Sequence, residues 1–342
     1  MVLQKALPHD SKAAKKEVAD RLADFTTDTR VLPISLLAVV IGAISALVAY
    51  VLLWLIRLIT NISFHHSFSA SFQSPARNHL GLFVILVPAV GGLIIGLMAR
   101  FGSEKIRGHG IPEALEAILI GRSRIEPKVA ILKPISSAIS IGTGGPFGAE
   151  GPIIMTGGAC GSLIAQLFHL SSAERKTLLV AGAAGGMAAV FATPIAASLL
   201  AVELLLFEWK PRSFIPVALA SITAAILRVP LLGAGPVFAI PAHAALPISG
   251  LLVAYLVGTV AGFGSGLLTA LVYGCEDLFR KLPIHWMWWP VLGGLVVGAG
   301  GFFEPRALGV GYDTIHDVLI GHMVLGVVLG LMIVKAIIWS TA

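Results

Sequence analysis

The residue in this sequence best placed to do chemistry is Glu150, a single carboxylate in the glycine-rich stretch GTGGPFGAEGPIIMTGG at residues 142–158. Apolar segments flank this stretch, so we expect the carboxylate at or inside a membrane, where an ionisable side chain is costly and marks a functional site. Gly151 and Pro152 lead into an apolar run, which predicts a helix start. A helix N-terminus binds anions through unpaired amides and partial positive charge. Glu150 is therefore a candidate gate that competes with a diffusing anion, and the alternative is a simple helix cap on a hydrated loop.

A second glycine-rich motif, GHGIP at residues 108–112, has a similar character. It precedes a short helical segment, so its backbone amides are also placed to face an anion. Two helix N-termini that converge would form a dehydrated anion site without a full positive charge, and weak binding of this kind suits rapid passage. His109 is a candidate hydrogen-bond donor whose charge changes near neutral pH, and the alternative is an ordinary loop histidine.

Two other charged residues lie inside apolar runs of helical length. Lys133 precedes the glycine-rich stretch, so its charge either raises the local potential for anions or reaches an interface by snorkelling. Glu203 is a candidate for a proton path or a buried hydrogen-bond network. Asp313, His316 and Asp317, in contrast, are interpreted as loop and helix-cap groups.

The composition is that of a membrane protein. Of the 342 residues, 56% are hydrophobic and only 12% are charged, against about 25% charged in soluble domains. The formal charge of +6 is spread over loops and span ends, which favours anionic lipid headgroups over nucleic acid as a partner. Cys160 and Cys275 have no metal-ligand or disulfide spacing, and no catalytic motif is present, so we predict no metal, no cofactor and no enzymatic activity.

The apolar pattern predicts an all-α polytopic membrane protein, because the apolar runs exceed the roughly ten residues of a barrel strand. Residues 1–30 alternate charged and apolar positions at helical spacing, which predicts a cytoplasmic amphipathic segment. Several later helices are shorter than the roughly 20 residues that cross a bilayer, and interrupted helices line substrate pathways in transporters. The helices predicted after residue 30 cover residues 32–62, 80–101, 112–120, 128–141, 153–167, 171–190, 194–207, 214–232, 248–279, 286–303, 314–320 and 323–339.

An internal repeat divides the chain. Three short motifs recur in the same order in both halves: LPIS from residues 32 and 246, PxxGGLxxG from residues 88 and 290, and GxG from residues 108 and 309. We therefore predict a first transmembrane repeat over residues 31–245 and a partial, truncated second repeat over residues 246–342. The counterpart of Glu150 would fall after Ala342, so we expect any site built between the two halves to be incomplete.

These motifs resemble those of the CLC family of chloride channels and chloride/proton antiporters. GHGIP at residues 108–112 is similar to the family's GSGIP, and GAEGP at residues 148–152 is similar to its G(K/R)EGP. Lys133 lies at the family's usual distance before the glutamate. FATP at residues 191–194, followed by Glu203, is similar to the family's FxAP helix that ends in a glutamate.

The resemblance, which covers about residues 30–340, implies a CLC-type inverted-repeat helical fold with half-length helices and a homodimer with one pore per subunit. We accordingly expect an integral protein of a bacterial plasma or inner membrane that transports chloride or a similar small anion. The resemblance identifies Glu150 as the gate, with Glu203 on a proton path and Lys133 in the pore electrostatics. It also implies anion contact by backbone amides near Gly110, Ile111, Phe147 and Gly148. Over both glycine-rich motifs, our candidate anion-binding residues are Gly108, His109, Gly110, Ile111, Pro112, Phe147, Gly148, Ala149, Gly151 and Pro152.

Three positions depart from the family's pattern. His109 replaces the serine whose hydroxyl contacts the anion, which leaves chloride, nitrate and fluoride open, and Ala149 replaces a basic residue. Leu204 stands where many antiporters have a second glutamate as the internal proton acceptor. Because leucine carries no proton, a channel is slightly favoured, and chloride/proton antiport is the alternative. A non-conducting structural or regulatory membrane subunit is the alternative of another class.

Overall fold

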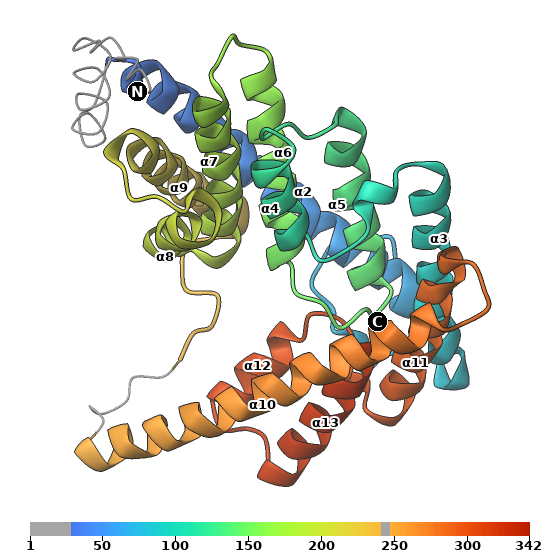
Figure 1. Cartoon of the computed structure of the whole chain (residues 1–342). Helices are drawn as coiled ribbons and strands as arrows, with labels where there is room; N and C mark the ends of the chain where they lie inside the picture. Colours follow the sequence, from blue (N-terminus) through green and yellow to red (C-terminus); the bar gives the residue numbers. More distant parts are fainter. Residues whose placement is uncertain (1–28, 241–246) are drawn as a thin grey trace, which may run out of the picture.

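A computed structural model of the chain describes residues 29–240 and 247–342 (Figure 1). Within these ranges the regular secondary structure is helical, without a strand, which confirms the predicted all-α fold. The amphipathic segment predicted for residues 1–30 lies outside the described residues except at its last two positions.

The helices begin and end within a few residues of the predicted boundaries. In the first half, α5 and α6 lie on either side of the glycine-rich loop, and the segment after Pro194 ends in a π-helical turn, Ala201–Leu206. The helices of the first half are α2 (Val31–His65), α3 (Leu86–Phe101), α4 (Ile111–Leu119), α5 (Pro127–Gly142), α6 (Glu150–Gln166), α7 (Ser172–Phe191), α8 (Pro194–Leu200) and α9 (Pro211–Leu232). Those of the second half are α10 (Ile248–Arg280), α11 (Trp289–Phe303), α12 (Tyr312–Leu319) and α13 (Leu325–Thr341).

Five helical segments among the described residues are long and apolar enough to cross a membrane. They are Val31–His65, Gly81–Phe101, Pro211–Leu232, Ile248–Arg280 and Trp286–Phe303. The helices that carry the motifs, α4, α6 and α12, are not among them. Because a helix that ends inside the membrane exposes its polar terminus there, this arrangement is suited to lining a pathway for a polar solute.

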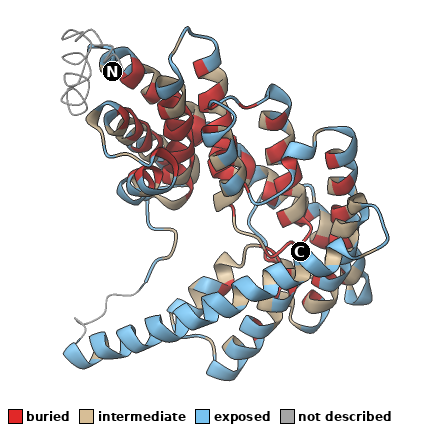
Figure 2. Ribbon diagram, in the orientation of Figure 1, coloured by how far each residue is buried: buried red, intermediate tan, exposed pale blue. Residues whose placement is uncertain are grey.

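The core of the first half is built from small residues on α6 and α7. A Cβ atom built at Gly157 would collide with the carbonyl of Gly182, and one built at Gly182 would collide with the carbonyl of Gly157. Figure 2 shows buried residues concentrated along α7 and its neighbours. In a membrane there is no hydrophobic force between helices, and close backbone packing of this kind holds them together instead. The contact fixes the position of α6, whose first residue is Glu150.

The two halves meet through α3 and α11, and their contact is reciprocal. A Cβ atom at Gly92 would collide with the carbonyl of Pro290, and a Cβ atom at Gly294 would collide with the carbonyl of Pro88. These are the equivalent positions of the PxxGGLxxG repeat, so each half presents the same surface to the other, as in a two-fold interface. The inverted repeat expected from the sequence is thus visible in the packing, with the second half lying against the α3 end of the first (Figure 1).

Helix α10 lies along the outside of the second half. None of its residues is buried, and it appears exposed along its length in Figure 2. It packs against α13, and the ring of Phe279 near its end lies 6.2 Å from the ring of Trp289, the first residue of α11. The exposed side chains are mostly apolar, which fits a surface that faces lipid or other protein rather than water.

Candidate functional site

The two glycine-rich loops lie in direct backbone contact. The carbonyl of His109 packs against Gly151, where a Cβ atom would collide with it, and the carbonyl of Gly151 packs in the same way against Gly110. Gly110 also has a φ of +103°, a conformation that favours glycine. Helices α4 and α6 therefore begin side by side, with the amides of both N-termini at one place.

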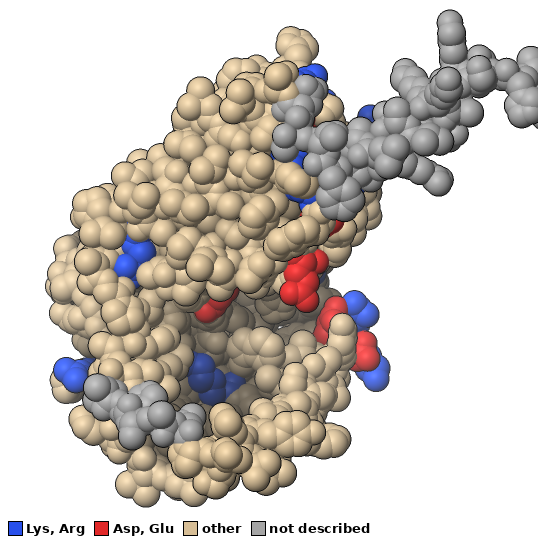
Figure 3. Space-filling model, turned by 90° about the vertical axis from the view of Figure 1, so that its left-hand side faces the viewer, with Lys and Arg blue, Asp and Glu red and all other residues tan. Residues whose placement is uncertain are grey.

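A cavity of about 700 Å³ opens at this junction and is lined by residues from both halves. Of the residues expected to bind an anion, Gly110, Pro112 and Ala149 belong to the same loops but do not line it. The face shown in Figure 3 is hollowed, with acidic and basic side chains visible in and around the hollow. The expected residues that line the cavity are Gly108, His109, Ile111, Phe147, Gly148, Gly151 and Pro152, together with Glu150 and Lys133.

Glu150 is the first residue of α6 and is half-buried. Its carboxylate folds back over Gly148, where an added Cβ atom would collide with a carboxylate oxygen. The acid thus covers a backbone position that was expected to bind an anion. The carboxylate thus lies at the N-terminus of its own helix, where unpaired amides and partial positive charge favour a negative group.

The N-terminus of α4 carries an acid as well, which the sequence analysis missed. A carboxylate oxygen of Glu113 accepts a hydrogen bond of 2.6 Å from the backbone N–H of Gly110. This is the side-chain half of a capping box, in which the third helical residue satisfies the amide of the cap. The sequence signal was present, since Glu113 stands three residues after Gly110. An anion at this terminus has to share the amide with Glu113 or displace it.

Lys133 is almost completely buried, with 1% of its surface exposed. Its ammonium donates to the carbonyls of Ile106 at 2.8 Å and Gly108 at 2.7 Å, and more weakly to Arg107 at 3.3 Å. Of the two alternatives for Lys133, snorkelling to an interface is therefore wrong, because all three donors of the ammonium are used inside the protein. The lysine holds the segment that leads into His109 and places a positive charge behind it.

An ion pair at the start of α5 supports the same segment. The ammonium of Lys105 donates to the carboxylate of Glu126 at 2.5 Å, just before α5 begins. This hydrogen bond, and then the lysine's charge, hold the pKa of the Glu126 carboxyl below its usual value. Residues 104–108 are thus attached to α5 at two points, once at its exposed start and once at buried Lys133.

The second half repeats this construction with Lys335, which the sequence analysis also missed. Its ammonium donates to the carbonyls of Gly309 at 3.2 Å and Val310 at 3.4 Å, in the loop that precedes α12. The N–H of Gly309 in turn donates to the carbonyl of Gly144 at 3.0 Å, so this loop is docked on the one that leads to Glu150. The sequence signal for Lys335 is the same as that for Lys133, a lone lysine in an apolar helical run that follows a GxG motif.

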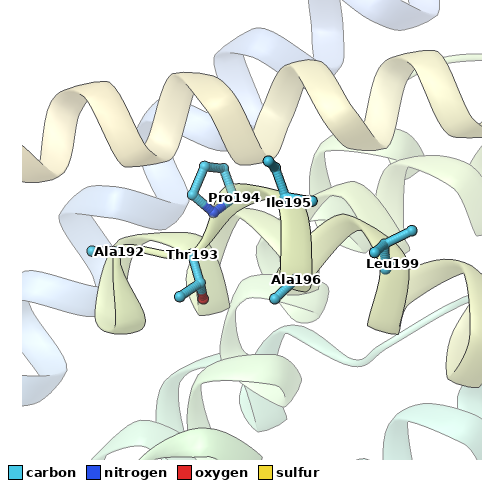
Figure 4. A pocket seen from close by; sticks show the side chains of 6 residues that line it. All are labelled: Ala192, Thr193, Pro194, Ile195, Ala196 and Leu199. Atoms are coloured by element: carbon cyan, nitrogen blue, oxygen red, sulfur yellow. The ribbon is translucent and has the colours of Figure 1, made fainter. Parts of the chain in front are cut away.

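Glu203 is not brought together with the gate. It lies in the π-helical turn on an exposed position, as does Leu204, and neither lines the cavity. The start of the same segment forms a separate, open and apolar depression, shown in Figure 4 and lined by Ala192, Thr193, Pro194, Ile195, Ala196 and Leu199. No charged side chain lines that depression, so it lacks the features of an anion site.

A helical membrane fold in which short helices meet through glycine-rich N-termini at a cavity is the architecture of membrane transport proteins. Comparison with protein families makes the assignment specific. The model of the family described as voltage gated chloride channel matches residues 91–342, and the chain belongs to this family.

The curated relatives are bacterial. A ClcB-like protein of Ralstonia nicotianae is 30% identical over 240 residues, which cover 69% of this chain and 56% of the relative. The voltage-gated ClC-type chloride channel ClcB of Escherichia coli is 28% identical over 272 residues, which cover 78% of this chain and 64% of the relative. The chain thus spans less than two thirds of the length of these relatives.

Solved structures support the fold. A slow cyanobacterial Cl⁻/H⁺ antiporter matches with a TM-score of 0.77 at 18% identity, covering 92% of this chain and 75% of that one. A CLC-type fluoride/proton antiporter matches with a TM-score of 0.75 at 20% identity, covering 92% of this chain and 77% of that one. At these identities the likeness establishes the shared fold.

Proposed function

We propose that this chain forms a pathway for chloride or a similar small anion across a bacterial plasma or inner membrane, gated by Glu150. The observation that carries the proposal is the backbone contact between the loops of His109 and Gly151, which puts the N-termini of α4 and α6 at one cavity beside the Glu150 carboxylate. The ClcB relatives support chloride as the anion. The ligand is the transported ion, and the site needs no cofactor.

The proposed mechanism is competition between two anions for one site. Backbone amides at the two helix N-termini attract an anion without a fixed positive charge next to it, so binding is weak enough for release. The Glu150 carboxylate covers Gly148 and excludes the diffusing anion while it is ionised. Protonation removes its charge and its affinity for the amides, and the side chain then leaves the site to the anion.

A channel mechanism is slightly favoured. Leu204 follows Glu203, so the position of the second acid carries no proton, and Glu203 does not line the cavity. Antiport with protons is the second candidate, supported by the fold shared with a Cl⁻/H⁺ and a fluoride/proton antiporter. In that case protons move through Glu150 and on to a group other than the one at position 204.

We further propose that the chain pairs with a second copy. The outer faces of α8 and α9, which pack together, expose large apolar side chains, among them Ile195, Leu199, Ile222 and Ile226. A surface of this kind serves contact with lipid or with another helix surface. Each copy contains its own pair of loops and its own Glu150, so each subunit carries one pathway.

The test is chloride efflux from liposomes that contain the purified chain, with the internal pH followed at the same time. Chloride flux that is altered in rate or pH dependence by Glu150→Gln supports the gate. Glu116→Gln, an exposed acid on α4, is the matched control and should behave as the unaltered chain. Flux that builds a proton gradient selects antiport, and flux without one selects the channel.

Two results would contradict the proposal. Flux that is indifferent to Glu150→Gln would remove Glu150 as the gate. Correctly folded protein without flux of chloride, nitrate or fluoride would support the alternative of a structural or regulatory membrane subunit.

A further inference from the structure

The hydroxyl of Tyr312 is a buried hydrogen-bond donor with no partner among the described residues. Tyr312 is the first residue of α12 and follows Gly311, the cap of that helix. Burying an O–H group without a partner is costly, so a buried tyrosine hydroxyl usually has one. The missing partner is explained if a mobile side chain accepts a hydrogen bond from this hydroxyl in another conformation of the protein.

The ring of Tyr312 is held in place by contacts with the first half of the chain. The loop before it is hydrogen-bonded to Gly144 through the N–H of Gly309. Val310 packs against the apolar cluster that includes Phe147, in the loop before Glu150. The ring also makes an edge contact with Phe238, with 5.8 Å between the ring centroids. The hydroxyl is thus fixed in position independently of any hydrogen bond that it makes.

The loop before Tyr312 is docked on the loop that leads to Glu150. The Glu150 carboxylate lies close enough to Tyr312 for the two groups to interact electrostatically. In this structure the carboxylate is folded over Gly148, and a rotation about its side-chain bonds moves it by several ångströms. We propose that the Tyr312 hydroxyl donates a hydrogen bond to the ionised Glu150 carboxylate in a second gate position, and so positions the gate from the opposite half of the fold.

The other charged groups around the cavity are already engaged or carry the wrong chemistry. Lys133 and Lys335 donate to backbone carbonyls, and Glu113 accepts from the Gly110 amide. Asp313 is an acid near Lys335 and cannot donate when ionised. The remaining ionisable side chains that line the cavity are Arg107, His109, Cys275 and Glu276. Two buried neutral donors without a partner among the described residues lie in this part of the fold, the indole N–H of Trp289, which lines the cavity, and the hydroxyl of Tyr312. Tyr312 is the one that interacts electrostatically with Glu150.

The consequence is a pH effect, because a hydrogen bond to the charged form of an acid favours that form. Removing the donor by Tyr312→Phe should make the gate easier to protonate. The pH at which flux is half-maximal should therefore move upward by about one unit, the size expected for a hydrogen bond to a charged group. The substitution keeps the ring and its contact with Phe238, so the fold should be retained.

The first test does not depend on transport. Infrared difference spectra of the purified full chain follow the carboxyl band that Glu150→Gln abolishes, as the pH is varied. In Tyr312→Phe the midpoint of this band should move upward by about one pH unit. Tyr255→Phe, on the exposed face of α10, should leave it unchanged. An unchanged midpoint in Tyr312→Phe overturns the inference, whatever the flux measurements show.

The second test rests on the proposed function and separates positioning from structure. Tyr312→Phe should shift the pH profile of flux in the unaltered chain and should have no effect in the Glu150→Gln background. An equal effect in both backgrounds would mean that the hydroxyl acts on the fold, and would overturn the inference. A shifted carboxyl band with flux indifferent to Glu150→Gln would leave the hydrogen bond standing and refute the gate instead.

Discussion

The contact between the two glycine loops makes a specific prediction about Gly151. A Cβ atom at this position would lie well inside contact distance of the His109 carbonyl oxygen, which is a backbone atom and cannot rotate away. Gly151→Ala must therefore push the α4 and α6 N-termini apart. Because both loops are attached elsewhere, through Lys133 and through the α6–α7 contact, the displacement is opposed by the rest of the first half.

The expected cost follows from two opposing effects. Overpacking a well-packed contact costs about 1–3 kcal/mol, whereas replacing glycine by alanine inside a helix stabilises it by about 0.8–1.0 kcal/mol, and by less in the first turn. We expect a net loss of about 1–2 kcal/mol in the free energy of unfolding. The functional loss should be larger, because losing one hydrogen bond between an amide and an anion weakens binding by about tenfold or more.

The assay pairs this variant with Gly158→Ala on the same helix. A Cβ atom at Gly158 would lie 3.3 Å from a terminal methyl group of Leu179, a flexible side chain that can move. Gly158→Ala should therefore unfold at or above the temperature of the unaltered chain and retain chloride flux, while Gly151→Ala unfolds earlier and loses most of its flux. Equal behaviour of the two variants, in both unfolding and flux, would refute the described loop contact.

Three more predictions follow from the site and the repeat. Lys133→Met leaves three carbonyls without a donor, so it should lower the free energy of unfolding by about 1–3 kcal/mol in thermal unfolding, and milder loss would mean that water replaces the ammonium. Glu113→Gln should strengthen anion binding about threefold to tenfold, as measured by calorimetry, and the control Glu116→Gln should not. The reason is that two like charges a few ångströms apart repel by about 1 kcal/mol in water-like surroundings. Gly92→Ala and Gly294→Ala should each destabilise by about 1–3 kcal/mol and by similar amounts, and unequal effects would argue against a reciprocal contact.

The positions of the helices could be predicted because apolar length, glycine and proline are local signals. The start of α6 at Glu150 and the start of α4 beside Pro112 both follow from such signals. The exposure of Glu203 could not be predicted, because an apolar run does not reveal which side of a helix faces the core. The geometry of its π-helical turn decides this, and it emerges only in the folded chain.

The residues that the sequence analysis missed all depend on contacts between segments that are far apart in the sequence. Glu113 was readable as a capping residue, but its competition with an anion depends on where α6 begins. Lys335 holds the loop before Tyr312, and this loop docks on the first half through Gly144, in the segment that leads to Glu150. A repeat visible in the sequence predicts that the two halves pair, but it does not predict which side chain of one half lies near Glu150 of the other.

The repeat has a physical consequence for the site. Each half supplies a short helix with an acid in its first turn, Glu113 on α4 and Asp313 on α12. Each half also supplies a lysine, Lys133 or Lys335, that donates to backbone carbonyls of the loop before that short helix. Within each half the negative charge of the acid offsets the positive charge of the lysine, so neither helix N-terminus presents a full positive charge to an anion. The attraction that remains comes from backbone amides, which weaken when loops move by a fraction of a hydrogen-bond length. Rigid glycine contacts between the loops are therefore what such a site requires, and the reciprocal packing of α3 on α11 gives both halves the same support.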